Sequence, residues 1–382
     1  MDQILDFPSA ANHAGGLPPE LDGLRRSAPV SRVRLPDGRV AWLVTRHEHV
    51  STVLAGGQFT RDTTGPGPGA MRTVNMDGAP HQELRGVVSR AFTVRQIENL
   101  RPRVRELTDR LLDRMAAAGP PADLVRHLAA PLPGIVICEM LGFPAGDHDR
   151  LAAWCDRITA VHAGGLDQAA WRELGGYVEG ALRRPRRPDG DLLATLAEAE
   201  NDGRITRPEL ISLAIVILAG GLETTRTAIS AGVLRLLEHP AQLARLRADP
   251  HLIGAAVEEM IRFQPVVDLN RLQVATADVW LGDQLVRTGD LVQVSVNAAN
   301  RDEDVFPGGA EFDIGRRPNP HLAFGHGAHR CLGAALARVE LGTVLAALLR
   351  RFPALDLAVP AENLRWRGGH VAVGLEELPV TW

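Results

Sequence analysis

The sequence is poor in cysteine, and this scarcity excludes two kinds of site. Only three cysteines occur among 382 residues, at Cys138, Cys155 and Cys331. None belongs to a paired C-x-x-C motif, so a zinc site built from cysteine pairs is excluded. Three cysteines without partners are also typical of a reducing cytoplasm, which excludes a disulfide scaffold.

Long apolar runs, a strong net charge and linker-like stretches are also lacking. The longest apolar run, residues 213–222, meets Glu223 and is too short to cross a bilayer. A formal net charge of −4 predicts no nucleic-acid or polybasic membrane partner. The first residues, Met1 to Asp6, lack the basic flank and apolar run of a signal peptide or anchor. Without a linker or repeat, residues 1–382 are expected to form one domain.

What the sequence does contain is one loop motif, F-G-H-G-A-H-R-C-L-G, from Phe324 to Gly333. It places Cys331 in the first turn of an apolar helix expected to run to about residue 351. Gly325 and Gly327 permit positive-φ turns that direct backbone N–H groups toward the sulfur, and the helix start stabilises an anion. A single cysteine is usually a small core residue. Here the flanking pattern instead favours a shielded thiolate of the kind that binds haem iron.

This motif resembles the signature F-x-x-G-x-x-x-C-x-G of the cytochrome P450 family, the haem-thiolate monooxygenases. The match lies at Phe324, Gly327, Cys331 and Gly333, and the resemblance to the soluble bacterial type extends from about Leu21 to the end of the chain. It implies a mainly α fold with a small β lobe, in which haem b lies between a long distal helix and the helix that follows Cys331. Cys331 is then the iron ligand, and Phe324 and Gly333 contact the cofactor.

The distal helix is predicted from the capping box that begins at Thr206 and from the His239-Pro240 stop, which bound a helix over residues 206–238. Two interior glycines, Gly220 and Gly221, cost about 1 kcal/mol each against alanine. They indicate either close helix packing, with threonine bonding back to the preceding turn, or an opened groove. The resemblance implies the groove, with Glu223 and Thr224 as the acid–alcohol pair that handles dioxygen and delivers protons.

A second helix carries Glu259 and Arg262, which share a face at a spacing of three. An E-x-x-R pair usually lies on a solvated surface. The resemblance identifies this one with the family's buried triad, with Arg316 as the third member and the adjacent Arg317 as the alternative. We expect a structural ion pair that fixes the loop before the cysteine, not a catalytic role.

The haem propionates need cations or hydrogen-bond donors. The resemblance assigns this role to His81, Arg85, Arg271 and His329, the first two within a stretch similar to D-P-P-E-H-T-R-L-R. The chain departs from that pattern at Gly78-Ala79 and at Glu83, where a basic residue is frequent. The second departure lowers the positive charge expected for docking an acidic electron donor, for which Arg90, Arg95, Arg330 and Arg338 remain.

The rest of the sequence predicts the positions of the β-rich and helical regions and the residues of the substrate pocket. Strands are expected in residues 30–45 and 270–300, with helices over 80–263 and 331–351. Residues 59–73 include a Gly/Pro run that is a candidate lid. By resemblance the substrate pocket is lined by Leu218, Leu222, Val266, Val267, Asp268, Leu269 and Val371. Because most of these are small and aliphatic, we expect a bulky apolar secondary metabolite as substrate, with Asp268 facing either a basic group or solvent.

No G-x-G-x-x-G unit or cysteine cluster is fused to the chain, so separate ferredoxin and NAD(P)H-dependent ferredoxin reductase partners are implied, in the cytoplasm. The predicted reaction is oxidation of the substrate by dioxygen, as hydroxylation, epoxidation or oxidative coupling. The alternatives are a haem-thiolate protein that binds ligands without hydroxylating and a peroxide-driven peroxygenase. The Glu223–Thr224 pair counts against both, because neither needs a proton relay.

Overall fold

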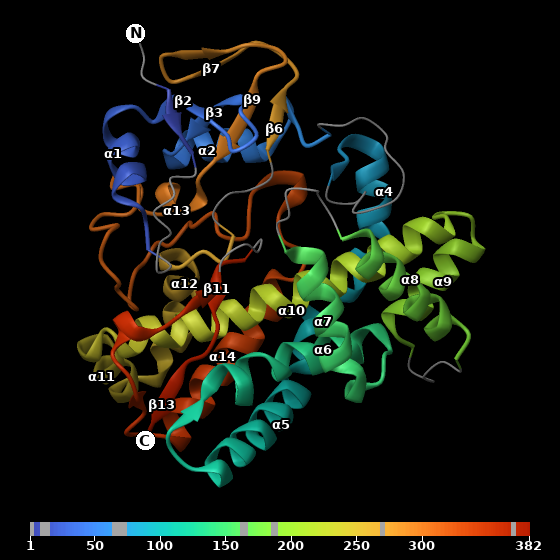
Figure 1. Cartoon of the computed structure of the whole chain (residues 1–382), viewed down its shortest axis with the longest axis vertical. Coiled ribbons are helices and arrows are strands. Elements are labelled where there is room, and N and C mark those ends of the chain that lie inside the picture. The colour runs from blue at the N-terminus through green and yellow to red at the C-terminus, as the bar shows by residue number, and fades with distance from the viewer. Residues whose placement is uncertain are drawn as a thin grey trace.

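The structure is a computed structural model that describes residues 4–7, 16–62, 75–160, 167–184, 190–267, 272–367 and 372–382. Helices make up most of the molecule, and the longer strands gather in one lobe at the top of Figure 1. The predicted mainly α fold with a small β lobe is therefore confirmed.

The helices described are α1 (Pro19–Ser27), α2 (His47–Ala55), α4 (Gly78–Ser89), α5 (Val94–Ala118), α6 (Pro131–Leu141), α7 (His148–Thr159), α8 (Gln168–Leu182), α9 (Leu192–Asn201), α10 (Arg207–Leu237), α11 (Pro240–Ala248), α12 (Ile253–Phe263), α13 (Val296–Ala299) and α14 (Ala334–Arg351). The strands described are β1 (Leu5–Asp6), β2 (Val30–Arg34), β3 (Val40–Val44), β4 (Phe59–Thr60), β5 (Ala122–Asp123), β6 (Gln273–Ala275), β7 (Val279–Leu281), β8 (Gln284–Val286), β9 (Leu291–Val294), β10 (Asp356–Leu357), β11 (Trp366–Arg367), β12 (Gly374–Leu375) and β13 (Pro379–Thr381).

The main sheet joins the two predicted β regions. Its strand order is β1-β2-β3-β9-β6-β4. The β2–β3 hairpin is antiparallel, with Val30 opposite Val44 and Arg34 opposite Val40, and β3 then pairs in parallel with β9. The hairpin β7–β8 turns at Gly282, which has a φ of 62°. Strands were thus correctly expected in both regions.

Helix α10 is the central element and crosses the middle of the molecule in Figure 1. Its 31 residues give a rod of about 46 Å. It begins with the predicted capping box, in which Thr206 and Glu209 bond reciprocally. By length and composition it is the one helix among the described residues that could cross a membrane, but it is mostly buried against other helices. It is therefore the core helix of the helical lobe.

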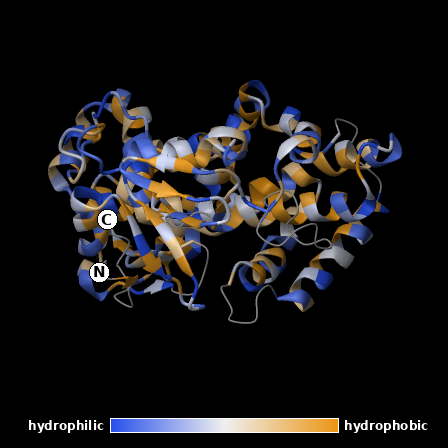
Figure 2. Cartoon of the chain, turned by 90° about the horizontal axis from the view of Figure 1, so that it is seen from above, coloured by the Kyte–Doolittle hydropathy of each residue, from blue (hydrophilic) through white to orange (hydrophobic). Residues whose placement is uncertain are grey.

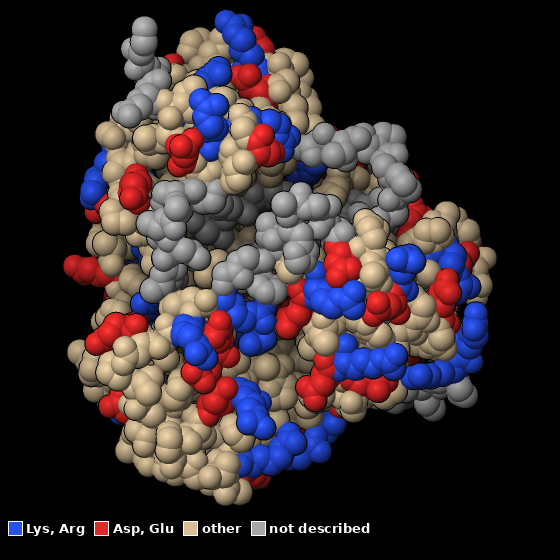
Figure 3. Space-filling view, viewed as in Figure 1, with Lys and Arg blue, Asp and Glu red and all other residues tan. Residues whose placement is uncertain are grey.

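Apolar side chains unite the helices around α10, and a smaller cluster fills the space beneath the sheet. Figure 2 shows the apolar residues concentrated where elements meet and the hydrophilic ones on outward-facing turns. On the face in Figure 3, basic and acidic side chains of the described residues are interspersed. Many of them form surface ion pairs, each of which contributes little to stability.

One predicted boundary is wrong. Helix α14 begins at Ala334, with Gly333 as its N-cap residue, whereas the sequence indicated a start at Cys331. Arg330 has an extended conformation, with φ −54° and ψ 137°, so the chain leaves the preceding 3-10 turn before it enters the helix. Cys331 therefore lies in the loop just ahead of α14.

Candidate active site

The cysteine loop is closed by short-range backbone contacts. The N–H of Cys331 donates to the carbonyl of Phe324 at 2.7 Å. Gly325 and Gly327 have φ values of 71° and 69°, which only glycine adopts readily. A Cβ on Gly327 would lie 2.8 Å from backbone atoms of Ala55. The second glycine is thus required both by its dihedral angle and by the close approach of α2.

Cys331 differs from the other two cysteines. It is exposed, whereas Cys138 and Cys155 are buried. Protein atoms still crowd around it, and this burial raises the pKa of its thiol. The Gly333 N–H and the charge of Arg85 act in the opposite direction, as do the more distant arginines of the loop and of α14. Exposure decides what can reach the sulfur, and the surrounding donors and cations offset part of the increase that burial causes in its pKa.

Arginines around the loop have different partners. Arg85 of α4 donates to the carbonyl of Arg330 and so ties α4 to the cysteine loop. Arg338 of α14 donates to both oxygens of Glu258 at 2.6 and 2.8 Å and stacks over the ring of Phe324, 4.6 Å from its centroid. Burial alone would raise the pKa of Glu258, but the bonds from Arg338 and His321 lower it to about 2. Arg338 is therefore engaged in an ion pair within the fold, and its contribution to docking an electron donor stays a prediction.

Two imidazoles meet beside the loop. The rings of His81 and His329 stack with centroids 4.1 Å apart. His329 Nε2 donates to Asp77 Oδ1 at 2.7 Å, and Asp77 Oδ2 accepts from Thr60 and from the N–H of Arg61. Burial lowers the pKa of His329 to about 4 and lowers that of His81 as well, so both rings are neutral at pH 7. Asp77, the N-cap residue of α4, thus orients His329.

These residues fit the haem expected from the resemblance. The Nδ1 atom of His81 is buried and has no hydrogen-bond partner among the described residues. A buried polar atom without a hydrogen-bond partner lowers the stability of the fold. A propionate oxygen of haem would accept a hydrogen bond from this Nδ1 atom. Together with Arg85 and the exposed thiol of Cys331, the Nδ1 atom forms a set of groups suited to an iron porphyrin with two carboxylates. Arg271, the fourth predicted propionate partner, lies outside the described residues.

Helix α10 resolves the alternatives left open for its glycines. A Cβ on Gly221 would lie 3.0 Å from Ile137 of α6, whereas a Cβ on Gly220 would meet open space. Gly221 thus serves close helix packing, and its assignment to a groove is wrong. Gly220 leaves room beside its own carbonyl, which accepts a 2.5 Å hydrogen bond from the hydroxyl of Thr224.

The acid of the predicted pair has a partner that sequence reasoning missed. Glu223 is buried, and its Oε1 accepts from Nη2 of Arg367 at 2.6 Å. Arg367 lies on β11, 144 residues further along the chain, and also contacts Asp156 of α7. No spacing or motif in the sequence indicates this pairing.

The predicted triad is assembled in the structure. Arg262 donates to both oxygens of Glu259 at 2.7 Å, and both side chains are fully buried. Arg316 reaches Glu259 Oε1 at 3.3 Å, so Arg316, and not Arg317, is the third member. The remaining donors of Arg262 bond to the carbonyls of Asn300, Gly309 and Glu311. The pair thus holds the segment that precedes the cysteine loop.

The expected pocket residues are only partly described. Leu218 and Leu222 are buried, and Leu222 packs beside Gly134 of α6. Val266 and Val267 are half-buried after α12. Asp268, Leu269 and Val371 lie outside the described residues, as do residues 63–73 of the candidate lid.

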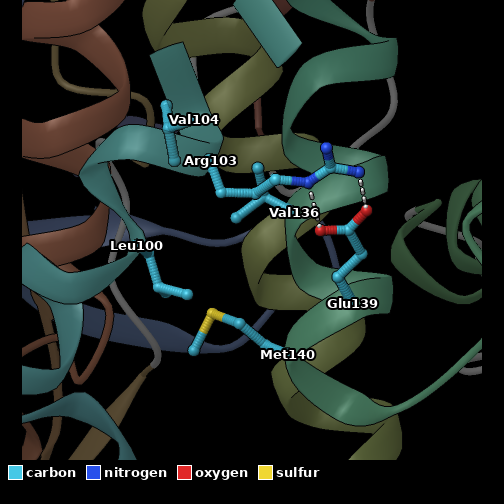
Figure 4. Close-up of a pocket in the computed structure, with 6 residues that line it drawn as sticks. All are labelled: Leu100, Arg103, Val104, Val136, Glu139 and Met140. Carbon is cyan, nitrogen blue, oxygen red and sulfur yellow. Dashed lines mark hydrogen bonds and ion pairs between the residues drawn. The ribbon is translucent and has the colours of Figure 1, made fainter. Parts of the chain in front are cut away.

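A separate hollow of about 330 Å³ lies between α5 and α6 (Figure 4). Its polar groups, Arg103 and Glu139, already satisfy each other in an ion pair with bonds of 2.6 and 3.0 Å. The other lining residues are Leu100, Val104, Val136 and Met140. The hollow contains none of the predicted site residues.

A glycine-built loop with an exposed thiol, flanked by an arginine and two imidazoles, defines a haem-thiolate protein. The comparisons with known proteins agree. The cytochrome P450 family model matches residues 179–357. Nocardicin C N-oxygenase of Nocardia uniformis subsp. tsuyamanensis is 44% identical, over 98% of each chain. Mycinamicin IV hydroxylase/epoxidase of Micromonospora griseorubida is 42% identical, over 94% of each.

Among solved structures, a cytochrome P450 with biaryl coupling reactivity covers the whole chain at a TM-score of 0.91 and 38% identity. The chain belongs to the cytochrome P450 family. It is a haem-thiolate monooxygenase that uses haem b, of the type found in bacterial secondary metabolism.

Proposed function

We propose that Cys331 is the iron ligand of this monooxygenase and that Glu223 and Thr224 deliver the protons that its reaction consumes. The observation that carries this proposal is the cysteine loop, which presents one exposed thiol and whose backbone is fixed by the bond from the Cys331 N–H to the Phe324 carbonyl, by the glycine turns and by the close contact with α2. Haem with a thiolate ligand supplies the activation of dioxygen.

The residues of the chain divide the remaining work. His81, Arg85 and His329 bind the propionates, with Arg271 as a fourth partner, and Phe324 and Gly333 lie against the cofactor. Asp77 accepts the Nε2–H of His329, so His329 donates to a propionate from Nδ1 only as the imidazolium, the form that the propionate's negative charge favours. The Thr224 hydroxyl holds a proton beside the open space at Gly220, and Glu223 supplies protons to it. Glu259, Arg262 and Arg316 are structural.

The substrate is a bulky apolar small molecule of bacterial secondary metabolism, which the enzyme hydroxylates, epoxidises or oxidatively couples. Support comes from relatives whose names specify a nocardicin, a mycinamicin and biaryl coupling, and from the aliphatic Leu218, Leu222, Val266 and Val267, with Leu269 and Val371. Asp268 faces a basic group of the substrate or solvent.

Electrons come from separate protein partners, a ferredoxin and an NAD(P)H-dependent ferredoxin reductase, in the cytoplasm. Arg90, Arg95 and Arg330 are exposed and supply positive charge for an acidic donor. Every one of the chain's 42 basic side chains is an arginine, so this charge does not titrate near neutral pH.

The test is the absorption spectrum of the purified protein, reduced with dithionite and exposed to carbon monoxide. A Soret band at the red-shifted position characteristic of the family is expected. Substrate candidates can then be titrated into the same sample and scored by a low-spin to high-spin shift. A band typical of histidine or protonated-thiol ligation in undamaged protein would disprove the assignment of Cys331.

A further inference from the structure

Glu223 is held by a residue from a distant part of the chain. We propose that Arg367 is a positioning residue for proton delivery: it fixes the carboxylate of Glu223 and links it through Asp156 to α7. This inference rests on the proposed function of Glu223.

The contacts around Arg367 are unequal. Its Nη2 donates to Glu223 Oε1 at 2.6 Å, while its Nη1 lies 3.4 Å from Asp156 Oδ2. The side chains of Glu223 and Arg367 are 5% and 16% exposed, whereas that of Asp156 is 42% exposed. Charge-assisted bonds are strongest when short and shielded from water. Arg367 therefore holds Glu223 firmly and Asp156 loosely.

The backbone delivers Arg367 to this place. In the β11–β12 hairpin, Arg367 pairs with Gly374, and a Cβ on Gly374 would lie 2.5 Å from the hydroxyl oxygen of Thr227. Thr227 is one turn beyond Glu223 on α10, so the two share a helix face. The hairpin is thus pressed onto the face of α10 that carries Glu223. A glycine at 374 is needed for that contact.

The pairing separates the acid from the alcohol. Thr224 donates its hydroxyl hydrogen to the Gly220 carbonyl, while Glu223 is bonded to Arg367. To pass a proton to Thr224, Glu223 must leave the guanidinium. Since an arginine keeps its charge at all working pH values, release requires movement of the hairpin or of α7. Asp156 gives α7 a hold on the same guanidinium, and this connects the position of α7 to proton delivery.

The hairpin offers a matched control. Arg365 lies two residues before Arg367 and forms an exposed ion pair with Glu376 at 2.8 Å. The variants are therefore Arg367→Gln, Arg367→Lys, Glu223→Gln, the Glu223→Gln/Arg367→Gln double variant, and Arg365→Gln as control. Each is first reduced and exposed to carbon monoxide. Retention of the red-shifted Soret band shows that the haem-thiolate site is intact, whereas its absence from the unmodified protein would contradict the proposed function itself.

The infrared stretching band of bound carbon monoxide then reports the charges near the ligand, without need of a substrate. Arg367→Gln should shift or split this band, because the Glu223 carboxylate loses its bond to the guanidinium and takes new positions. The double variant should lose the extra component, and Arg367→Lys and Arg365→Gln should keep the original band. A band unchanged by Arg367→Gln but moved by Glu223→Gln would overturn the proposal.

Thermal unfolding supplies a second measurement that does not depend on the spectrum. Each single substitution at Glu223 or Arg367 should lower the midpoint by a few degrees, and the double variant should lower it by little more than the larger single effect. Strictly additive losses would show that the two side chains are independent and would equally overturn the proposal.

Discussion

The two sides of the candidate haem site are held by different kinds of contact. On the cysteine side, the backbone itself fixes the loop: Cys331 bonds to Phe324 seven residues earlier, and Gly327 is wedged against α2. On the side of α10, the acid is bonded to the guanidinium of Arg367, which comes from 144 residues away. The first arrangement has little freedom. The second depends on contacts between side chains and changes when the hairpin or α7 moves.

This difference corresponds to what each side must do. An iron ligand needs a constant position and charge, which rigid backbone and buried ion pairs supply. A proton donor must approach and withdraw, so a detachable side-chain partner suits it better. The comparison therefore predicts that substitutions on the cysteine side change ligation or stability, whereas Thr224→Ala on α10 changes the course of the reaction and spares both.

Cys331→Ala should have the largest effect, the complete loss of the red-shifted Soret band in the reduced carbon monoxide complex. The reason is that Cys331 is the exposed thiol, and no other side chain in the loop can supply a thiolate. Cys138→Ala is the matched control, since that thiol is buried and burial raises its pKa to about 12. Retention of the band in Cys331→Ala would mean that another group ligates the iron.

Arg262→Met should have the second largest effect. The free energy of unfolding should fall by about 3–5 kcal/mol, because Glu259 would be left charged and fully buried. Denaturant titration measures it. Arg101→Gln is the control: Arg101 and Glu98 have the same spacing and a 2.7 Å contact, but both are exposed, so the expected loss is below about 1 kcal/mol. Equal losses in the two variants would show that burial of the triad is not what makes it important.

Glu340→Gln tests the burial of a carboxyl group on α14, on the cysteine side, through the pH dependence of the free energy of unfolding. Glu340 is fully buried, one of its oxygens lacks a partner, and burial raises its pKa from 4.5 to about 8. The folded state therefore retains a proton that the unfolded state releases, so stability falls as pH rises from about 4.5 to 8 and then levels off.

Between pH 6 and 9, the wild-type protein should lose about 3 kcal/mol relative to Glu340→Gln, measured by denaturant titration at each pH. The glutamine variant should thus be the more stable of the two above pH 8. Parallel stability curves for the two proteins would contradict the burial argument and show that Glu340 is ionised in the folded state.

The features that could be predicted from the sequence are those with local causes, and the features that could not depend on contacts between distant segments. The capping box at Thr206, the β2–β3 hairpin and the glycines of the cysteine loop were predictable because their causes are local: a side chain bonds three residues away, or a turn demands positive φ. The start of α14 was misplaced by three residues because the extended backbone at Arg330 follows from how the loop is closed, which a helical pattern does not reveal.

Contacts between distant segments were not predictable. Asp77 and His329 are 252 residues apart, and their bond depends on how α4 lies against the loop. The role of Gly221 depends on a side chain of α6, and the engagement of Arg338 depends on Glu258 of α12. A motif shows which residue types are present; it does not show which neighbour the fold will bring to each of them.

Thr224→Ala should have the smallest effect on the folded protein and the clearest effect on the reaction. The variant removes the hydroxyl that bonds to Gly220 on α10 but touches no residue of the cysteine side, so the red-shifted Soret band and the stability should remain close to those of the wild type. The share of electrons recovered as product should fall about tenfold, which corresponds to about 1.4 kcal/mol, with hydrogen peroxide formed instead.

The measurement is the ratio of product to NAD(P)H consumed, with a surrogate ferredoxin and reductase and a substrate found by the spin-state titration. Thr225→Ala is the control, because it removes the neighbouring hydroxyl, which is buried and is not a member of the acid–alcohol pair. Tight coupling in Thr224→Ala would remove Thr224 from the proton relay. Uncoupling together with loss of the Soret band would instead show that the two sides of the site are not separable, and the comparison from which the prediction was drawn would fail with it.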